Sequence, residues 1–138
     1  MKEIFNYTEK DLWKLLREKV QGHLVRIENI TTRGVPDLHA CHQGKTVWIE
    51  LKIGSSNTVY FQNSQIGFIG EAEKHGEKVK VLMRKDNLLY LIDGSILLNL
   101  VAKKVGDDKI SFKINELSRA YIWGEPWKWS EITQRIYE

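Results

Sequence analysis

The chain has 138 residues, of which 42% are hydrophobic, and its formal net charge is +3. This length predicts one domain, 1–138, with a substantial core, and the single cysteine excludes an internal disulfide. The weakly basic charge permits contact with nucleic acid but does not by itself indicate it. The charged start and the lack of an apolar run of about 20 residues predict neither a signal peptide nor a membrane span, so we expect a cytoplasmic protein.

A first helix is predicted to begin after Thr8 and to end at Gly22. Thr8 is a favourable N-cap with Asp11 three residues later, and leucines from Leu12 onward recur with helical spacing. Glu9 precedes Leu12 by three residues, so we expect its side chain on the inward stripe of this helix. A role for Glu9 in stabilising the positive helix N-terminus alone is an equal alternative.

Three β-strands are predicted next, at 24–28, 37–41 and 47–51. The last two show the period-2 alternation of strands. Gln43-Gly44 lies between them, where a two-residue turn favours a glycine at positive φ. These two strands should therefore form an antiparallel hairpin.

The register of this hairpin decides which side chains meet. With that turn, Asp37 lies directly opposite Glu50, and their Cβ atoms are about 4.5 to 5.5 Å apart. Lys52 shares the face of Glu50, and Pro36 suits the first position of a strand because it cannot donate to a central ladder. The hairpin is therefore predicted to hold two carboxylates and one lysine together.

This arrangement favours a cation site. Two carboxylates at such a distance repel each other unless a proton or a cation lies between them. Oxygen ligands with room for water suit Mg²⁺ or Mn²⁺ better than zinc. The alternative for Glu50 and Lys52 taken alone is a solvated charged face, but the register with Asp37 favours the cation site.

Cys41, with His39 and His42 beside it, raises the question of zinc. Successive side chains of a strand face opposite ways, so Cys41 and His42 cannot converge on one ion. The sequence contains no second cluster of cysteine and histidine, so we do not expect a zinc site.

Residues 63–75 are predicted to form a second long helix, which Gly76 ends. Gln65 lies in its first turn, where the side-chain amide could hold a water molecule or a phosphate. An ordinary polar residue of a first helical turn is the alternative.

Further strands are predicted at 78–83 and 88–92. The apolar run 95–102 is either a strand or a short helix, and 110–114 after Asp107-Asp108 suggests a hairpin. This order of elements fits a mixed sheet flanked by helices.

The C-terminal segment contains Trp123, Trp127 and Trp129 close to several lysines and arginines. Aromatic and cationic side chains in such a mixture can stack on exposed bases. We favour the alternative that these indoles cover the core or form a homodimer contact, because a domain of this size can use their large apolar area.

Two motifs carry a resemblance to a known family. Arg33-Gly34-Val35-Pro36-Asp37 and Trp48-Ile49-Glu50-Leu51-Lys52 resemble the PD-(D/E)xK nuclease signature, and they are most similar to the virus-type replication-repair nuclease (VRR-NUC) domain, including stand-alone phage versions. The resemblance extends from about Glu9 to Leu91 and includes Gln65, which matches the family's glutamine-bearing helix. It implies an α/β, more strictly α+β, single domain with a restriction-endonuclease-like mixed central sheet flanked by helices. The core would be about 9–92, with 103–138 as a helix-rich and aromatic-rich extension.

The resemblance also implies an activity, which is Mg²⁺-dependent or Mn²⁺-dependent hydrolysis of phosphodiester bonds in DNA. The implied catalytic residues are Asp37, Glu50, Lys52, Gln65 and Glu9, and the implied metal ligands are Asp37, Glu50, Glu9 and the backbone carbonyl of Leu51.

Stand-alone members of the family act on branched DNA, so a Holliday junction is the leading substrate, cut in a bacterium or a phage-infected cell. A junction has paired scissile sites, which match a C2 homodimer, and 96–101 or 121–129 is expected at the dimer contact. The alternatives are a flap or nicking endonuclease, a homing or restriction-type enzyme, and a catalytically silent DNA-binding module.

Overall fold

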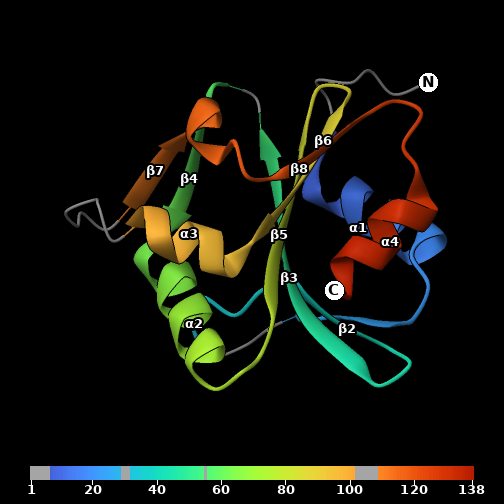
Figure 1. The fold of residues 1–138 in the computed structure, drawn as a ribbon, viewed down its shortest axis with the longest axis horizontal. Helices are drawn as coiled ribbons and strands as arrows, with labels where there is room; N and C mark the ends of the chain where they lie inside the picture. The colour runs from blue at the N-terminus through green and yellow to red at the C-terminus, as the bar shows by residue number, and fades with distance from the viewer. Residues whose placement is uncertain (1–6, 29–31, 55, 102–108) are drawn as a thin grey trace.

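The computed structural model describes residues 7–28, 32–54, 56–101 and 109–138. Its centre is a six-stranded mixed sheet in which β3 and β5 are parallel and the other neighbouring strands are antiparallel (Figure 1). Strands β4 and β7 form a separate antiparallel pair. In spatial order the central strands are β1 His23–Arg26, β2 Leu38–His42, β3 Lys45–Gly54, β5 Val79–Lys85, β6 Leu88–Asp93 and β8 Tyr121–Gly124, and the small sheet consists of β4 Thr58–Gln62 and β7 Lys109–Lys113.

Helices cover both faces of the central sheet. The helices are α1 Glu9–Lys19, α2 Asn63–Lys74, α3 Gly94–Val101 and α4 Trp129–Ile136, with a short 3-10 helix η2 at Ile114–Leu117. Helices α1 and α4 pack on one face, and α2, α3 and the small sheet lie on the other (Figure 1). Each face therefore has its own apolar layer. None of the helices in the described segments has the length and apolar character needed to cross a bilayer.

The predicted start of α1 is confirmed by its cap. The Thr8 hydroxyl accepts a hydrogen bond from the Asp11 N–H at 3.2 Å, and the Asp11 carboxylate accepts one from the Thr8 N–H at 3.0 Å. This reciprocal pair satisfies two backbone donors that the helix cannot satisfy internally. Leu12 and Leu16 are fully buried, so the predicted apolar stripe faces the sheet.

The predicted hairpin is also confirmed. Gln43 and Gly44 have φ angles of 52° and 79°, as a two-residue turn of the favoured hairpin type requires. β2 and β3 then pair in the predicted register, with Leu38 opposite Ile49.

The small sheet of β4 and β7 was not predicted from the sequence. Strand β4 is missing from the predicted elements, although Val59 and Phe61 are buried between more exposed neighbours, as strand alternation requires. The predicted hairpin at 110–114 is wrong, because the segment before it, 94–101, is helix α3 and offers no strand partner. β7 pairs with β4 instead. The expected turn at Asp107-Asp108 lies outside the described residues.

The C-terminal tryptophans pack within the domain, which confirms the preferred alternative of core packing. Trp123 lies in β8 and is 8% exposed, and Trp127 and Trp129 pack against the same apolar layer. The Trp127 indole N–H donates to the Asn87 carbonyl at 3.1 Å. The guanidinium of Arg84, itself buried, stacks on the ring of Trp127 at 4.6 Å.

Candidate active site

The β2–β3 hairpin brings Asp37 and Glu50 together. Asp37 immediately precedes β2, and Glu50 lies within β3 and is 5% exposed. The Asp37 carboxylate accepts a hydrogen bond from the Leu51 N–H at 2.7 Å, and its charge acts on the neighbouring Glu50 carboxyl group. A half-buried acid and a buried acid are therefore held next to each other.

Glu50 has a strongly perturbed protonation equilibrium. Its pKa is raised from 4.5 to about 8, first by burial and then by the charge of Asp37, while the charge of Lys52 lowers it. At neutral pH the pair therefore holds a proton, unless a cation takes the place of that proton. This is the behaviour expected of a carboxylate pair that binds a metal ion.

Gln65 connects the two β3 side chains. Its Nε2 donates to Glu50 Oε2 at 2.5 Å, and its Oε1 accepts from Lys52 Nζ at 3.2 Å. The same Oε1 accepts from the backbone N–H of Gln62 at 2.9 Å, in the capping box that begins α2. A fixed helix terminus thereby sets the orientation of the Gln65 amide, and through it the positions of Glu50 and Lys52.

Lys52 also contacts Glu50 and the ring of Phe61. Its side chain is 17% exposed, and Nζ lies 3.8 Å from Glu50 Oε2 and 4.7 Å from the centre of the Phe61 ring. Phe61 is a member of the site that the sequence analysis missed. The signal was the alternation in β4, which assigns Phe61 to the core side of that strand.

Gly34 explains how the loop before Asp37 reaches the start of α2. Its φ is +82°, and a Cβ atom there would lie 2.1 Å from the Ser64 carbonyl oxygen and 2.8 Å from the Gln65 backbone nitrogen. Only glycine fits this backbone conformation and this close contact without strain. The loop that carries Asp37 and the helix that carries Gln65 therefore touch.

Glu9 lies at the edge of the site. The residue as a whole is exposed, so the expectation that it belongs to the inward stripe is wrong: Glu9 is the first residue of α1, ahead of the buried Leu12, and only part of its side chain is covered. Burial of its carboxyl group and the charge of Asp37 raise the pKa of Glu9, while Lys52 and Arg26 lower it. Glu9 and Lys52 line a common cavity of about 280 Å³.

The donor set fits a hard divalent cation. All the side-chain donors are oxygens, and burial together with the charge of Asp37 opposes the ionisation of Glu50 at neutral pH. Within the described segments, no group of three or more His, Cys, Asp or Glu side chains is placed to hold a metal ion, so the side-chain donors here number two. Two carboxylates supplemented by water suit Mg²⁺, which keeps several of its own water molecules in protein sites.

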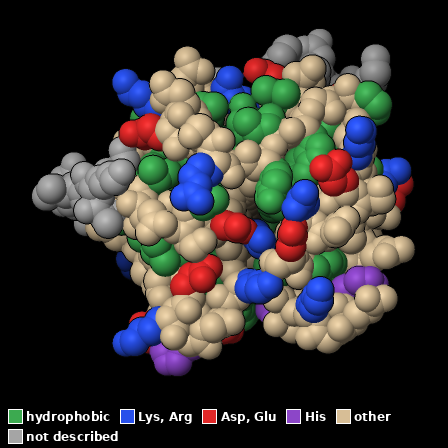
Figure 2. Space-filling model, in the orientation of Figure 1, with side chains coloured by type: hydrophobic (Ala, Val, Ile, Leu, Met, Phe, Trp, Pro, Cys, Tyr) green, Lys and Arg blue, Asp and Glu red, His purple; other side chains and the backbone are tan. Residues whose placement is uncertain are grey.

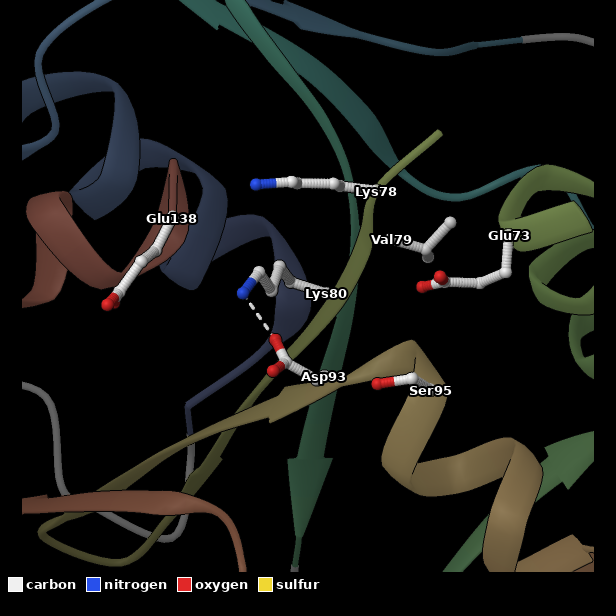
Figure 3. Close-up of a pocket in the computed structure, with 7 residues that line it drawn as sticks. All are labelled: Glu73, Lys78, Val79, Lys80, Asp93, Ser95 and Glu138. Atoms are coloured by element: carbon white, nitrogen blue, oxygen red, sulfur yellow. Dashed lines mark hydrogen bonds and ion pairs between the residues drawn. The ribbon is translucent and has the colours of Figure 1, made fainter. Parts of the chain in front are cut away.

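A second polar cavity, of about 150 Å³, lies at the start of β5 (Figure 3). Lys80 and Asp93 are opposite each other in the β5–β6 ladder and form an ion pair there. Burial and then the charge of Asp93 raise the pKa of Glu73, while Lys80 and Lys78 lower it. Acidic and basic side chains also lie close together near the centre of the face in Figure 2. Because Lys80 and Asp93 neutralise each other across two strands, we interpret this cavity as a structural feature.

The fold is similar to that of a characterised enzyme. The structure of Hjc, a Holliday junction resolvase from the archaeal hyperthermophile Archaeoglobus fulgidus, matches with a TM-score of 0.61 and 12% sequence identity, over 94% of this chain and 95% of the Hjc chain. The match confirms the predicted fold class, a single α+β domain with a restriction-endonuclease-like mixed sheet flanked by helices. The sequence matches no protein-family model and no curated protein.

Proposed function

We propose that the protein is a divalent-metal-dependent DNA endonuclease that cuts branched DNA, with the Holliday junction as its leading substrate. The observation that carries the proposal is the Asp37–Glu50 pair, in which Glu50 is buried, with Lys52 and Gln65 fixed beside it. The fold shared with a resolvase supports the choice of substrate. The family resemblance of the two motifs supports the same choice independently.

In this proposal Asp37, Glu50 and the Leu51 carbonyl would hold Mg²⁺ or Mn²⁺, and Glu9 would be a further candidate ligand. When bound, the ion supplies Lewis-acid stabilisation of the scissile phosphate and promotes ionisation of water. Asp37 is kept in place by the Leu51 N–H, and Glu50 by the Gln65 amide. The hairpin therefore presents both carboxylates in one fixed arrangement.

Lys52 has a different task. Its ammonium group orients the attacking water and neutralises negative charge that develops on the phosphate in the transition state. The hydrogen bond to Gln65 and the Phe61 ring beneath it restrict where Nζ can move. Gln65 acts as a positioning residue, because it touches both Glu50 and Lys52.

The rival function is a DNA-binding module without catalysis. Carboxylates next to a polyanion repel it, so binding alone gives no reason to keep Asp37 and Glu50 side by side. Such a module would be improved by losing these acids, whereas a metal-dependent nuclease needs them.

The test is cleavage of labelled DNA of defined shape. Four-way junctions, flaps, nicked duplexes and linear duplexes are incubated with the protein, with and without Mg²⁺ or Mn²⁺. We expect metal-dependent cuts in opposing strands of the junction and weaker or no cutting of linear duplex. Preferred cutting of flaps would replace the Holliday junction with the flap or nicking alternative, and binding without cleavage would favour the silent module.

A matched pair of variants assigns the site. Glu50→Gln should bind junctions with at least the affinity of the wild type but fail to cut them. Glu18→Gln, on the exposed side of α1, removes one carboxylate elsewhere and should cut normally. Cleavage by Glu50→Gln at the wild-type rate would refute the active-site assignment.

A further inference from the structure

Tyr60 is an exposed aromatic residue beside the candidate active site. It lies in β4 and is 57% exposed, more than any other large apolar side chain in the described residues. Its neighbours Val59 and Phe61 are buried, so strand alternation directs Tyr60 to the outer side of the small sheet. The next residue in β4 is Phe61, which contacts the candidate site directly because its ring packs against Lys52.

Tyr60 also lines both hollows that adjoin Lys52. One is the cavity of about 280 Å³ shared with Glu9, and the other, of about 180 Å³, is shared with Gln65. A third cavity, of about 490 Å³, is lined by Thr58 and Lys113, and Thr58 also lines the first. The three cavities therefore lie in a row beside β4, from the one lined by Gln65 to the one lined by Lys113.

The strand register supplies a cation on the same outer face. Thr58 pairs with Lys113, and Tyr60 pairs with Ser111. Lys113 is exposed and lies two residues along from the position opposite Tyr60, which is roughly 7 Å of strand. The small side chain of Ser111 leaves the Tyr60 ring uncovered from that direction.

We infer that the outer face of β4 and β7 binds the DNA strand next to the scissile phosphate, with Tyr60 stacked on an unpaired base and Lys113 in contact with a phosphate. The inference rests on the proposed nuclease function and specifies how the site selects its substrate. An aromatic ring gains stacking only from a base whose face is open, and bases inside a continuous duplex have both faces covered. Tyr60 therefore favours DNA with unstacked bases, as at a branch point.

The test measures DNA binding in the Glu50→Gln background, so that cleavage does not interfere. Tyr60→Ala should weaken binding to flaps and junctions with unpaired bases by between about fivefold and about 150-fold, the range seen for loss of one base–aromatic stack. Binding to linear duplex should change by less than about twofold. Tyr60→Phe keeps the ring and should retain branched-DNA affinity.

Two further measurements separate stacking from general charge. A 2-aminopurine placed at the unpaired position should be quenched by the protein with Tyr60 and not by Tyr60→Ala. Lys113→Ala should reduce the slope of log affinity against log salt by about 0.7 to 0.9. Lys74→Ala, at the opposite end of α2 from Gln65, removes the same charge and should leave both measurements unchanged.

The outcomes distinguish this inference from the proposed function. If the wild-type chain neither binds nor cuts branched DNA, the proposed function fails. If it binds and cuts, but Tyr60→Ala has the same affinity and quenching, the inference is overturned while the function stands. A loss of dimer mass in Tyr60→Ala without DNA would also overturn it, because Tyr60 would then contact a second copy of the chain.

Discussion

Glu50→Gln should stabilise the metal-free protein, and the gain should grow with pH. The amide of glutamine keeps an acceptor for Gln65 and carries no charge that Asp37 would repel, so the hydrogen bond from Gln65 can survive the change. The substitution removes only the ionisable proton. Its effect on the free energy of unfolding therefore reports the cost of ionising Glu50.

The sign and size of the effect follow from the raised pKa. The pKa of Glu50 is about 8 in the folded chain and 4.5 as the ordinary value, so between these pH values the folded chain binds more protons than the unfolded chain. The contribution of protonated Glu50 to the free energy of unfolding is therefore fully present below pH 4.5 and is lost as pH rises through about 8. The pKa difference corresponds to about 5 kcal/mol. Water entering near the partly exposed Lys52 reduces this value, so we expect about 2 to 4 kcal/mol at pH 9.

Thermal unfolding followed by circular dichroism at pH 5, 7 and 9 measures this difference. A gain of 2 to 4 kcal/mol corresponds to roughly 10 °C in Tm for a domain of this size. Adding 10 mM MgCl₂ at pH 9 should raise the Tm of the wild type and leave that of Glu50→Gln nearly unchanged, because a ligand stabilises only the state that binds it. Glu18→Gln serves as the matched control and should follow the wild type at each pH.

Parallel pH–stability curves for wild type and Glu50→Gln would refute the reasoning, because they would mean that Glu50 ionises freely in the folded chain. A magnesium effect of equal size in both proteins would instead place metal binding elsewhere. The first result tests whether Glu50 is buried in the folded chain. The second tests whether Asp37 and Glu50 bind a metal ion.

Four other predictions concern individual side chains. Lys52→Ala should lower kcat for junction cleavage at least about 100-fold with little change in junction affinity, measured by single-turnover cleavage and anisotropy; unchanged kcat would exclude a role for Lys52 in the transition state. His39→Ala and Cys41→Ser should each keep cleavage within about tenfold, a barrier change of about 1.4 kcal/mol, because the His39 ring packs on an aromatic neighbour; stoichiometric zinc in the purified protein would contradict this. We predict a homodimer whose contact includes β8, so the wild type should have the mass of a dimer by light scattering and Ile122→Lys that of a monomer, since Ile122 is 50% exposed on this edge strand; a monomeric wild type would contradict this. Trp127→Ala should lower the free energy of unfolding by about 2 kcal/mol, because the Trp127 indole packs in the domain and donates a hydrogen bond to Asn87. An unchanged Tm would contradict this.

The hairpin shows what the sequence could predict. Its turn, its register and the meeting of Asp37 with Glu50 all follow from Gln43-Gly44 and from strand alternation, which are local signals. The capped start of α1 at Thr8 is predictable for the same reason. Interactions between residues close in the chain leave a pattern in the sequence.

The rest depends on contacts between distant segments. β7 pairs with β4 across about 50 residues, and no local pattern announces that partner. The exposure of Glu9 depends on what packs over the first turn of α1, which helical spacing alone cannot give. The contact of the Phe61 ring with Lys52 can be predicted only after β4 has been identified, and the alternation that identifies β4 is only five residues long.

The buried charges separate stability from function. Among the described residues, Lys80, Arg84 and Glu50 are the charged side chains with almost no exposure. Lys80 is neutralised by Asp93, and Arg84 stacks on an aromatic ring. Glu50 has Lys52 at 3.8 Å, yet its pKa remains raised, so the lysine does not offset the burial and the second acid. Folding alone would be better served by an uncharged residue at position 50. A carboxylate kept there against stability is expected where a cation binds, and this is why the acid pair, rather than the larger or more polar cavities, is the site on which the proposed function depends.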